Sequence, residues 1–247
     1  MKLGDYLDST YLKTPKQAGL SDSETLEIVR KLTHEAIENE FYAVMVRPDY
    51  VRSLRMLLDE LDAKVQLGTV IDFPEGRNTV KEKMTEAQMV IANGADELDF
   101  VIDYTAYKNG DLEKVKEEVE ACSRLVLKSG KVIKWIIETA ALNDQQIVGI
   151  TKLIRDISET TLSEFPSEKI FIKSSTGFYQ TENDKPNGAT PHVIQLMIEN
   201  AGDLPVKASG GVRSKEDAEE MIKLGVKRIG TSSALKIVSG EVSKSDY

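Results

Sequence analysis

The sequence predicts a single α/β domain, residues 1–247, folded as a (β/α)8 TIM barrel. Short apolar segments alternate with longer segments of helical periodicity along the whole chain, an order typical of a parallel sheet covered by helices. A chain of 247 residues also has the length of one such barrel, although it would fit two small domains. No low-complexity linker divides the chain. The alternative α/β fold, an open doubly wound sheet, would usually contain fewer strands.

Eight apolar segments have the length and composition of strands. They are residues 6–10, 42–46, 65–71, 97–102, 132–138, 170–174, 206–208 and 228–230. Seven amphipathic segments between them predict helices at residues 21–38, 49–60, 80–92, 111–128, 144–159, 191–200 and 215–224. Ser21 and Glu24 form a capping box, and Asp144 and Ser214 are the expected N-caps of later helices.

The composition excludes several classes of function. A net charge of −9 gives no support to nucleic-acid binding. No segment has the length and apolarity of a membrane span, and residues 1–5 contain no apolar signal region, so we expect a cytoplasmic protein. Cys122 is the only cysteine, which rules out an intramolecular disulfide. With only His34 and His192 no histidine-rich metal site is expected, and no glycine-rich nucleotide motif is present.

Two lysines follow short apolar segments and precede small residues. Lys173 follows Ile-Phe-Ile at residues 170–172, and Lys207 follows Leu-Pro-Val at residues 204–206. Burial disfavours the ammonium form of a lysine, and two ammonium groups in one pocket disfavour each other. A neutral lysine amine is a nucleophile suited to Schiff-base chemistry. The alternative for Lys173 is a side chain that reaches the surface at the end of its strand.

A carboxylate is expected to face the barrel interior. In the strand at residues 97–102 the two-residue period places Glu97, Asp99, Val101 and Asp103 on one face. A buried carboxylate is strongly penalised unless it is paired or functional, so Asp99 needs a partner. The matching period of the next strand places Lys134 within reach of Asp99. A purely structural Asp99–Lys134 ion pair is the alternative to a catalytic role.

Glycines and serines after the last strands predict an anion site. Backbone N–H groups at the start of a helix bind anions, and barrels often bind phosphate after strands seven and eight. Gly-Gly follows strand seven, and Gly-Thr-Ser-Ser follows strand eight before a short apolar helix at residues 234–238. Without the second element, Gly-Gly would more often be only a turn. The candidate phosphate-binding residues are Gly177, Gly210, Gly211, Gly230, Ser232 and Ser233. Arg213 is expected to be structural or to attract the anion at long range.

Three blocks of this chain resemble the motifs of the deoxyribose-phosphate aldolase family. They are FIKSSTGF at residues 171–178, VKASGGVR at residues 206–213 and GADELDFVID at residues 94–103. The similarity extends in order from LDSTYLK at residues 7–13 to RIGTSSALKIV at residues 228–238. Three motifs in the same order and at matching separations are far more specific than any one of them.

The resemblance implies a class I aldolase. Such an enzyme cleaves 2-deoxy-D-ribose 5-phosphate reversibly to D-glyceraldehyde 3-phosphate and acetaldehyde through a lysine Schiff base, without a metal or an organic cofactor. It implies that Lys173 forms the imine, while Lys207 lowers the pKa of Lys173 and, with Asp99, relays protons. The partners would be phosphosugar and aldehyde substrates, and a homodimer is compatible with the family. The substrate-binding residues implied are Asp8, Thr10 and Thr176.

Several positions depart from the residue that the family usually has. They are Ser9, Met45, Arg47, Asp72, Asp103 and Ala234. None is a motif lysine or the relay aspartate, but these positions surround the mouth of the pocket, so the preference for the acceptor aldehyde is open. Arg47 and Asp72 end neighbouring strands, and we predict a salt bridge between them at the rim.

Two alternatives to this function remain. One is another class I aldolase or thiolase of the same superfamily, acting on a different phosphosugar. The other is a catalytically inactive barrel that binds a phosphosugar, although a binding protein has no use for two adjacent buried amines. The polar tail at residues 239–247 is predicted to be mobile. Its last residue, Tyr247, is either an incidental tyrosine or a general acid–base that enters the closed site.

Overall fold

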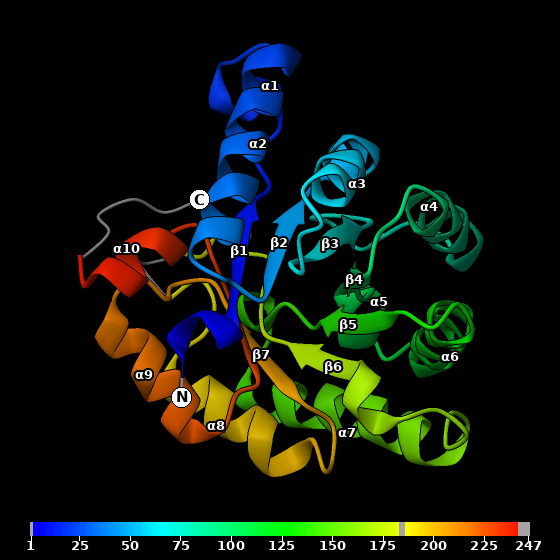
Figure 1. Ribbon diagram of the computed structural model, residues 1–247. Coiled ribbons are helices and arrows are strands. Elements are labelled where there is room, and N and C mark those ends of the chain that lie inside the picture. Colours follow the sequence, from blue (N-terminus) through cyan, green and yellow to red (C-terminus); the bar gives the residue numbers. More distant parts are fainter. Residues whose placement is uncertain (1, 183–185, 242–247) are drawn as a thin grey trace.

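The computed structural model describes residues 2–182 and 186–241, and they form a closed barrel of parallel strands in sequence order (Figure 1). The last strand pairs with the first, because Leu7, Asp8 and Ser9 lie opposite Ile229, Gly230 and Thr231. The strands are β1 (Leu7–Tyr11), β2 (Ala43–Val46), β3 (Gln66–Ile71), β4 (Glu97–Val101), β5 (Val132–Ile136), β6 (Ile170–Lys173), β7 (Val206–Ser209) and β8 (Arg228–Thr231). The predicted TIM barrel is therefore confirmed.

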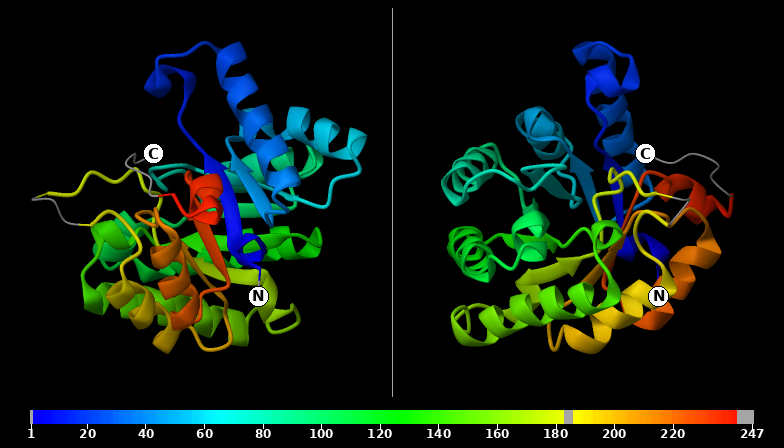
Figure 2. Two further views of the ribbon diagram at one scale, coloured as in Figure 1. Left: turned by 60° about the vertical axis from the view of Figure 1, so that its left-hand side comes forward. Right: turned by 180° about the vertical axis from the view of Figure 1, so that it is seen from behind.

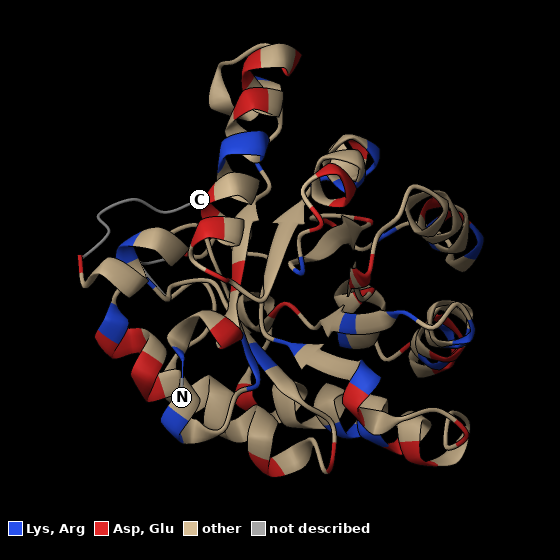
Figure 3. Ribbon diagram, viewed as in Figure 1, with Lys and Arg blue, Asp and Glu red and all other residues tan. Residues whose placement is uncertain are grey.

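Helices surround the barrel on its outside (Figures 1 and 2). The long helices are α2 (Asp22–Glu38), α3 (Val51–Glu60), α4 (Val80–Ala92), α6 (Leu112–Lys128), α7 (Asp144–Thr160), α8 (Pro191–Asn200) and α9 (Lys215–Leu224). The shorter ones are α1 (Pro15–Ala18), α5 (Tyr104–Lys108) and α10 (Ala234–Ser239). Acidic and basic residues are interspersed on the outer helices (Figure 3), and no helix within the described residues is long and apolar enough to cross a membrane.

Most predicted helix starts are confirmed, with one correction. Ser21 and Ser214 accept hydrogen bonds from the backbone N–H groups of residues three positions later, as capping boxes require. The predicted N-cap Asp144 is wrong, because Asn143 takes that position and its side chain accepts from the N–H of Gln146. Both residues are good N-caps, and the glutamine three residues after Asn143 completes a capping box that Asp144 lacks.

Two strands end in residues with left-handed backbone conformation. Asp72, directly after β3, has φ 53°, and Glu138, two residues after β5, also has φ 53°. Such values favour glycine, because a Cβ atom is strained there. Asp72 adopts this conformation although it is not glycine. The aspartate side chain compensates by accepting a hydrogen bond from the N–H of Asn78 at 2.8 Å.

The barrel interior is filled so closely that one glycine is needed for packing. Met45 on β2 is 1% exposed, and a Cβ atom on Gly68 of β3 would lie 2.1 Å from the Met45 sulfur. The Met45 side chain therefore occupies space that is free because its neighbour on β3 has no side chain. A substitution of Gly68 would displace Met45 into the interior where the charged side chains lie.

Candidate active site

Three lysines surround one carboxylate inside the barrel. The strand pairing places Asp99 opposite Lys134 and Lys173 opposite Lys207. The Asp99 Oδ2 atom lies 2.9 Å from the Nζ of Lys173 and 3.0 Å from the Nζ of Lys207. The Oδ1 atom lies 2.7 Å from the Nζ of Lys134, so the predicted Asp99–Lys134 pair is confirmed. The structure thus brings together Asp99 and Lys134, which the two-residue period predicts, with the two motif lysines. Asp103, which the same period placed on the face of Asp99, instead contacts Lys114 on α6.

Two further carboxylates form ion pairs with Lys207 and Lys134. Asp8 Oδ2 lies 2.5 Å from the Nζ of Lys207, and Glu97 Oε2 lies 2.7 Å from the Nζ of Lys134. Asp8 and Lys207 are both fully buried, so their ion pair is not exposed to solvent. Lys134 and Lys207 each have a second carboxylate partner besides Asp99. Lys173 differs from them, because Asp99 is its one carboxylate partner among the described residues.

The environment of Lys173 favours a neutral amine. Its side chain is 3% exposed, and burial lowers the pKa of Lys173 to about 8. The charge of Asp99 acts in the opposite direction, while the ammonium groups of Lys207 and Lys134 lower the pKa further. With a pKa of about 8, about a tenth of this lysine is unprotonated at pH 7, far more than for an ordinary lysine.

Asp99 and Lys134 stay charged. Burial by itself would raise the pKa of Asp99, but the ammonium groups of Lys134, Lys173 and Lys207 outweigh it and hold that pKa well below the usual range. Burial would likewise lower the pKa of Lys134, but the charges of Asp99 and Glu97 raise it above the usual range. One lysine with a lowered pKa beside a permanent ion pair is an arrangement that can form an imine and move protons.

The loop after Lys173 is held by hydroxyl and carboxylate contacts. The Ser174 hydroxyl donates to the Ser209 carbonyl at 2.8 Å and accepts from the Ser209 N–H at 2.9 Å, which joins β6 to β7 beside the lysines. The N–H of Thr176 donates to Glu138 at 3.2 Å, and the Thr176 hydroxyl bonds to the same carboxylate. Burial raises the pKa of Glu138. The position of Glu138 at a strand end was visible in the sequence, but its role in this loop was not.

The three predicted substrate-binding residues are nearly inaccessible, and Asp8 is fully buried. Thr176 is 1% and Thr10 4% exposed, and the Thr10 hydroxyl donates to the carbonyl of Asp8 at 2.8 Å. Asp8 contacts Lys207, as described above. Of the predicted set, Asp8 is therefore the residue that contacts a lysine of the cluster.

Three of the six candidate phosphate-binding residues line one cavity. A cavity of about 620 Å³ is lined by Gly177, Gly210 and Gly211, together with loop residues before α8. All three glycines have positive φ, between 81° and 85°. The loops here are in close contact, because a Cβ atom on Gly188 would lie 2.7 Å from the Cα of Gly210. The positive φ angles, which other residue types rarely adopt, explain why the chain has glycine at these three positions of the cavity wall.

The other three candidates do not line that cavity: Gly230 lies in β8, and Ser232 and Ser233 follow it directly. A Cβ atom on Gly230 would lie 3.0 Å from the Cε of Lys207, so this glycine makes room for the lysine. Ser232 is exposed, whereas Ser233 is buried and its N–H donates to the Thr231 hydroxyl at 3.0 Å. The sequence pattern could not distinguish a glycine that approaches a ligand from one that approaches a side chain.

The predicted salt bridge between Arg47 and Asp72 is wrong. Arg47 donates to two backbone carbonyls, Leu12 O at 2.8 Å and Phe73 O at 2.9 Å, and its guanidinium lies 4.8 Å from the Phe73 ring centre. Asp72 instead lies 3.2 Å from the Nζ of Lys83. The left-handed backbone of Asp72 turns its side chain away from β2 and towards α4. Tyr247 lies outside the described residues.

The chain is similar to known proteins over nearly its whole length. The model of the family described as DeoC/LacD family aldolase matches residues 8–240. A deoxyribose-phosphate aldolase of Streptococcus gordonii is 39% identical over 249 residues, covering 100% of both chains. A deoxyribose-phosphate aldolase of Thermococcus gammatolerans is 36% identical over 97% of this chain and 96% of the relative.

Solved structures show the same relationship. The deoxyribose phosphate aldolase from Aeropyrum pernix, described as tetrameric, has a TM-score of 0.77 at 32% identity over 96% of this chain and 89% of that chain. Association of this chain into a homodimer stays a prediction. Since the family model and these relatives match nearly the whole length, this chain belongs to the DeoC/LacD family of aldolases.

Proposed function

We propose that this aldolase cleaves 2-deoxy-D-ribose 5-phosphate reversibly to D-glyceraldehyde 3-phosphate and acetaldehyde through an imine on Lys173. The observation that carries the proposal is the environment of Lys173. Its Nζ is buried, has a pKa of about 8 and lies 2.9 Å from Asp99, whose carboxylate also binds Lys207. The names of the relatives support the substrate.

The chemistry follows from these groups. The neutral amine of Lys173 attacks the C1 aldehyde of the sugar, and loss of water from the carbinolamine gives an iminium ion. Removal of the proton from the C3 hydroxyl then breaks the C2–C3 bond, and the electron pair of that bond moves to the iminium nitrogen. Glyceraldehyde 3-phosphate leaves, the remaining enamine is protonated at carbon, and water releases acetaldehyde from Lys173. The proposal includes no metal or organic cofactor because the iminium nitrogen accepts the electrons.

Asp99 and Lys207 are proposed to move the protons. The carboxylate bridges the two amines at 2.9 and 3.0 Å, which is hydrogen-bonding distance for a proton relay. Lys134 holds the other oxygen of Asp99 and orients the carboxylate. Asp8 is proposed to hold Lys207, while Thr10 and Thr176 would contact the sugar once substrate enters.

The phosphate is proposed to bind in the cavity lined by Gly177, Gly210 and Gly211, with Gly230, Ser232 and Ser233 beside it. Support for this position comes from the glycine backbone, which a phosphate can approach closely. The nearby loops also support it, because β6 ends at Lys173 and β7 ends two residues after Lys207. A phosphate held there would present the other end of the sugar to the barrel interior.

A substrate comparison tests the function. We expect the protein to release acetaldehyde from 2-deoxyribose 5-phosphate and to act at least tenfold less well on ribose 5-phosphate and fructose 1,6-bisphosphate, measured as kcat/KM. A higher kcat/KM for another phosphosugar would show that the protein catalyses a different reaction of the same superfamily. Binding of the phosphosugars without any cleavage would identify the inactive barrel.

Removing the second lysine should shift the pH dependence of imine formation upwards. The neutral fraction of Lys173 grows as pH rises through its pKa of about 8, so the rate of adduct formation with acetaldehyde should level off above pH 8. Lys207 lowers that pKa. In Lys207→Met we therefore expect the inflection above pH 8 and slower adduct formation at pH 7, measured by borohydride trapping and intact mass. An inflection at the unchanged pH would show that Lys207 does not tune Lys173.

A further inference from the structure

A fourth fully buried lysine lies outside the active site. Lys83 on α4 is 0% exposed, and its ammonium group donates to the carbonyls of Gly76 at 3.0 Å and Val101 at 2.8 Å. It also bonds to the carboxylate of Glu118 on α6 and lies 3.2 Å from Asp72 Oδ2. One cation thus joins the β3–α4 loop to the end of β4 and to a helix. An apolar side chain could fill the space but could not make these four contacts.

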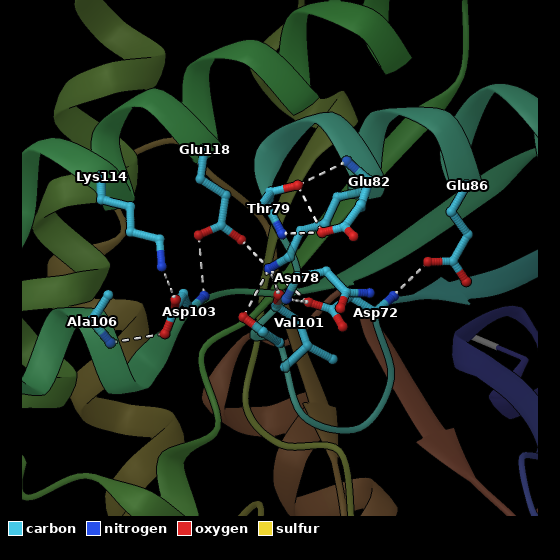
Figure 4. A network of polar contacts seen from close by, with 12 residues as sticks. Asp72, Asn78, Thr79, Glu82, Glu86, Val101, Asp103, Ala106, Lys114 and Glu118 are labelled. Atoms are coloured by element: carbon cyan, nitrogen blue, oxygen red, sulfur yellow. Dashed lines mark hydrogen bonds and ion pairs between the residues drawn. The ribbon is translucent and has the colours of Figure 1, made fainter.

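The loop joined in this way, residues 72–79, is held at both ends (Figure 4). At its start, the N–H of Asp72 donates to Glu86 at 2.9 Å, and the side chain of Asp72 accepts from the N–H of Asn78 at 2.8 Å. At its end, Thr79 caps α4 in a capping box with Glu82. Lys83 binds the loop at its start, through the Asp72 carboxylate, and in its middle, through the Gly76 carbonyl.

The loop also packs directly on the end of β4. Gly76 has φ +69°, and a Cβ atom there would lie 2.6 Å from the Ile102 carbonyl and 2.8 Å from the Val101 side chain. The carbonyls of Gly76 and Val101 therefore face one ammonium group from adjacent segments. Beyond the ammonium, the other oxygen of Glu118 accepts from the N–H of Asp103 at 3.1 Å, which ties the end of β4 to α6.

From this anchor the loop reaches the mouth of the barrel. Phe73 contacts Phe178, five residues after Lys173, with ring centres 5.1 Å apart in an edge-to-face arrangement. Glu75 and Arg77 line a cavity of about 350 Å³ together with Thr176 and Glu138, the pair that holds the loop after Lys173. The position of this wall of the mouth therefore depends on how firmly residues 72–79 are held.

We propose that Lys83 is a positioning residue: by fixing the β3–α4 loop it shapes the mouth of the barrel for the phosphosugar, and it takes no part in imine formation. This inference rests on the proposed function for its substrate. Lys83 does not contact Lys173 or Asp99 among the described contacts, so its removal should weaken substrate binding and leave the chemistry on acetaldehyde unchanged.

Two variants test this role. Lys83→Met keeps the length of the side chain and removes the charge, and Asp72→Gly removes the loop carboxylate at a position whose left-handed backbone suits glycine. In both we expect KM for 2-deoxyribose 5-phosphate to rise roughly tenfold, kcat to change less than about threefold, and acetaldehyde trapping on Lys173 to keep its rate. Lys114→Met is the control, because Lys114 binds Asp103 at 2.6 Å in the same network but is 43% exposed and does not contact residues 72–79. Its KM should stay within about twofold of the unmodified value.

The outcomes separate this inference from the proposed function. If the unmodified protein cleaves the sugar and both variants keep its KM, Lys83 is purely structural and the proposal fails. It also fails if kcat and acetaldehyde trapping fall while KM stays constant, because the effect would then be on the lysines. Should Lys83→Met not fold, the KM of Asp72→Gly decides. Absence of cleavage in the unmodified protein would refute the proposed function instead.

Discussion

Replacing Lys173 with methionine is expected to abolish both turnover and the adduct that borohydride traps in the presence of acetaldehyde. Methionine has nearly the length of lysine and fills the same buried space, so the barrel should still fold. Without the amine no imine can form, and the loss of a covalent nucleophile lowers turnover by roughly 10⁴-fold or more. Intact mass should show one ethyl group on the unmodified protein and none on Lys173→Met.

Lys169 provides the control for this experiment. It lies just before the opposite end of the same strand, where its Nζ donates to the Gly130 carbonyl at 3.0 Å. Lys169→Met should retain both the adduct and the turnover. An adduct that survives in Lys173→Met and maps to Lys207 would reverse the assignment of the two lysines.

Replacing Asp99 with asparagine is expected to reduce turnover by about 10²–10⁴-fold, the range for a lost general acid–base. Asparagine keeps the shape of the side chain but removes the charge that all three lysines share. Because the charge of Asp99 raises the pKa of Lys173, its removal should lower that pKa below 8. Adduct formation should therefore shift to lower pH, opposite to the shift expected for Lys207→Met, while turnover falls.

The matched control is Glu97→Gln. Glu97 is buried and binds Lys134 at 2.7 Å, as Asp99 does, but it makes no ion pair with Lys173 or Lys207. Glu97→Gln should retain most of the turnover and should be somewhat less stable, because Lys134 keeps only one carboxylate. Near-normal turnover in Asp99→Asn would reduce Asp99 to a structural counterion.

The barrel and its interior charges could be predicted because they follow from simple periodicity. The two-residue period of β4 and β5 places Asp99 and Lys134 on one face, and parallel pairing then brings them opposite each other. The apolar approach to Lys173 and to Lys207 likewise predicted burial, and both side chains are at most 3% exposed. Strand period and strand order require no knowledge of loop geometry.

The contacts of the loops could not be predicted, because they depend on backbone angles that the periodicity does not specify. The sequence placed Arg47 and Asp72 at neighbouring strand ends, but the left-handed backbone of Asp72 directs its carboxylate to Lys83. Lys83 itself lies in a segment whose helical pattern gave no sign of a buried charge, because its four acceptors come from three other segments. A pairing that depends on the φ angle of one residue is not encoded in periodicity.

The shared carboxylate of Asp99 has a consequence for the order in which the chain folds. Its bond to Lys207 joins residues 108 positions apart and its bond to Lys173 joins residues 74 apart. Contacts so distant along the chain form only after most of the loop entropy between them has been lost, so we expect them to be absent from the folding transition state. Variants at these positions should therefore change the rate of unfolding far more than the rate of folding. The residues proposed for the chemistry would then be assembled last and would govern the lifetime of the native state.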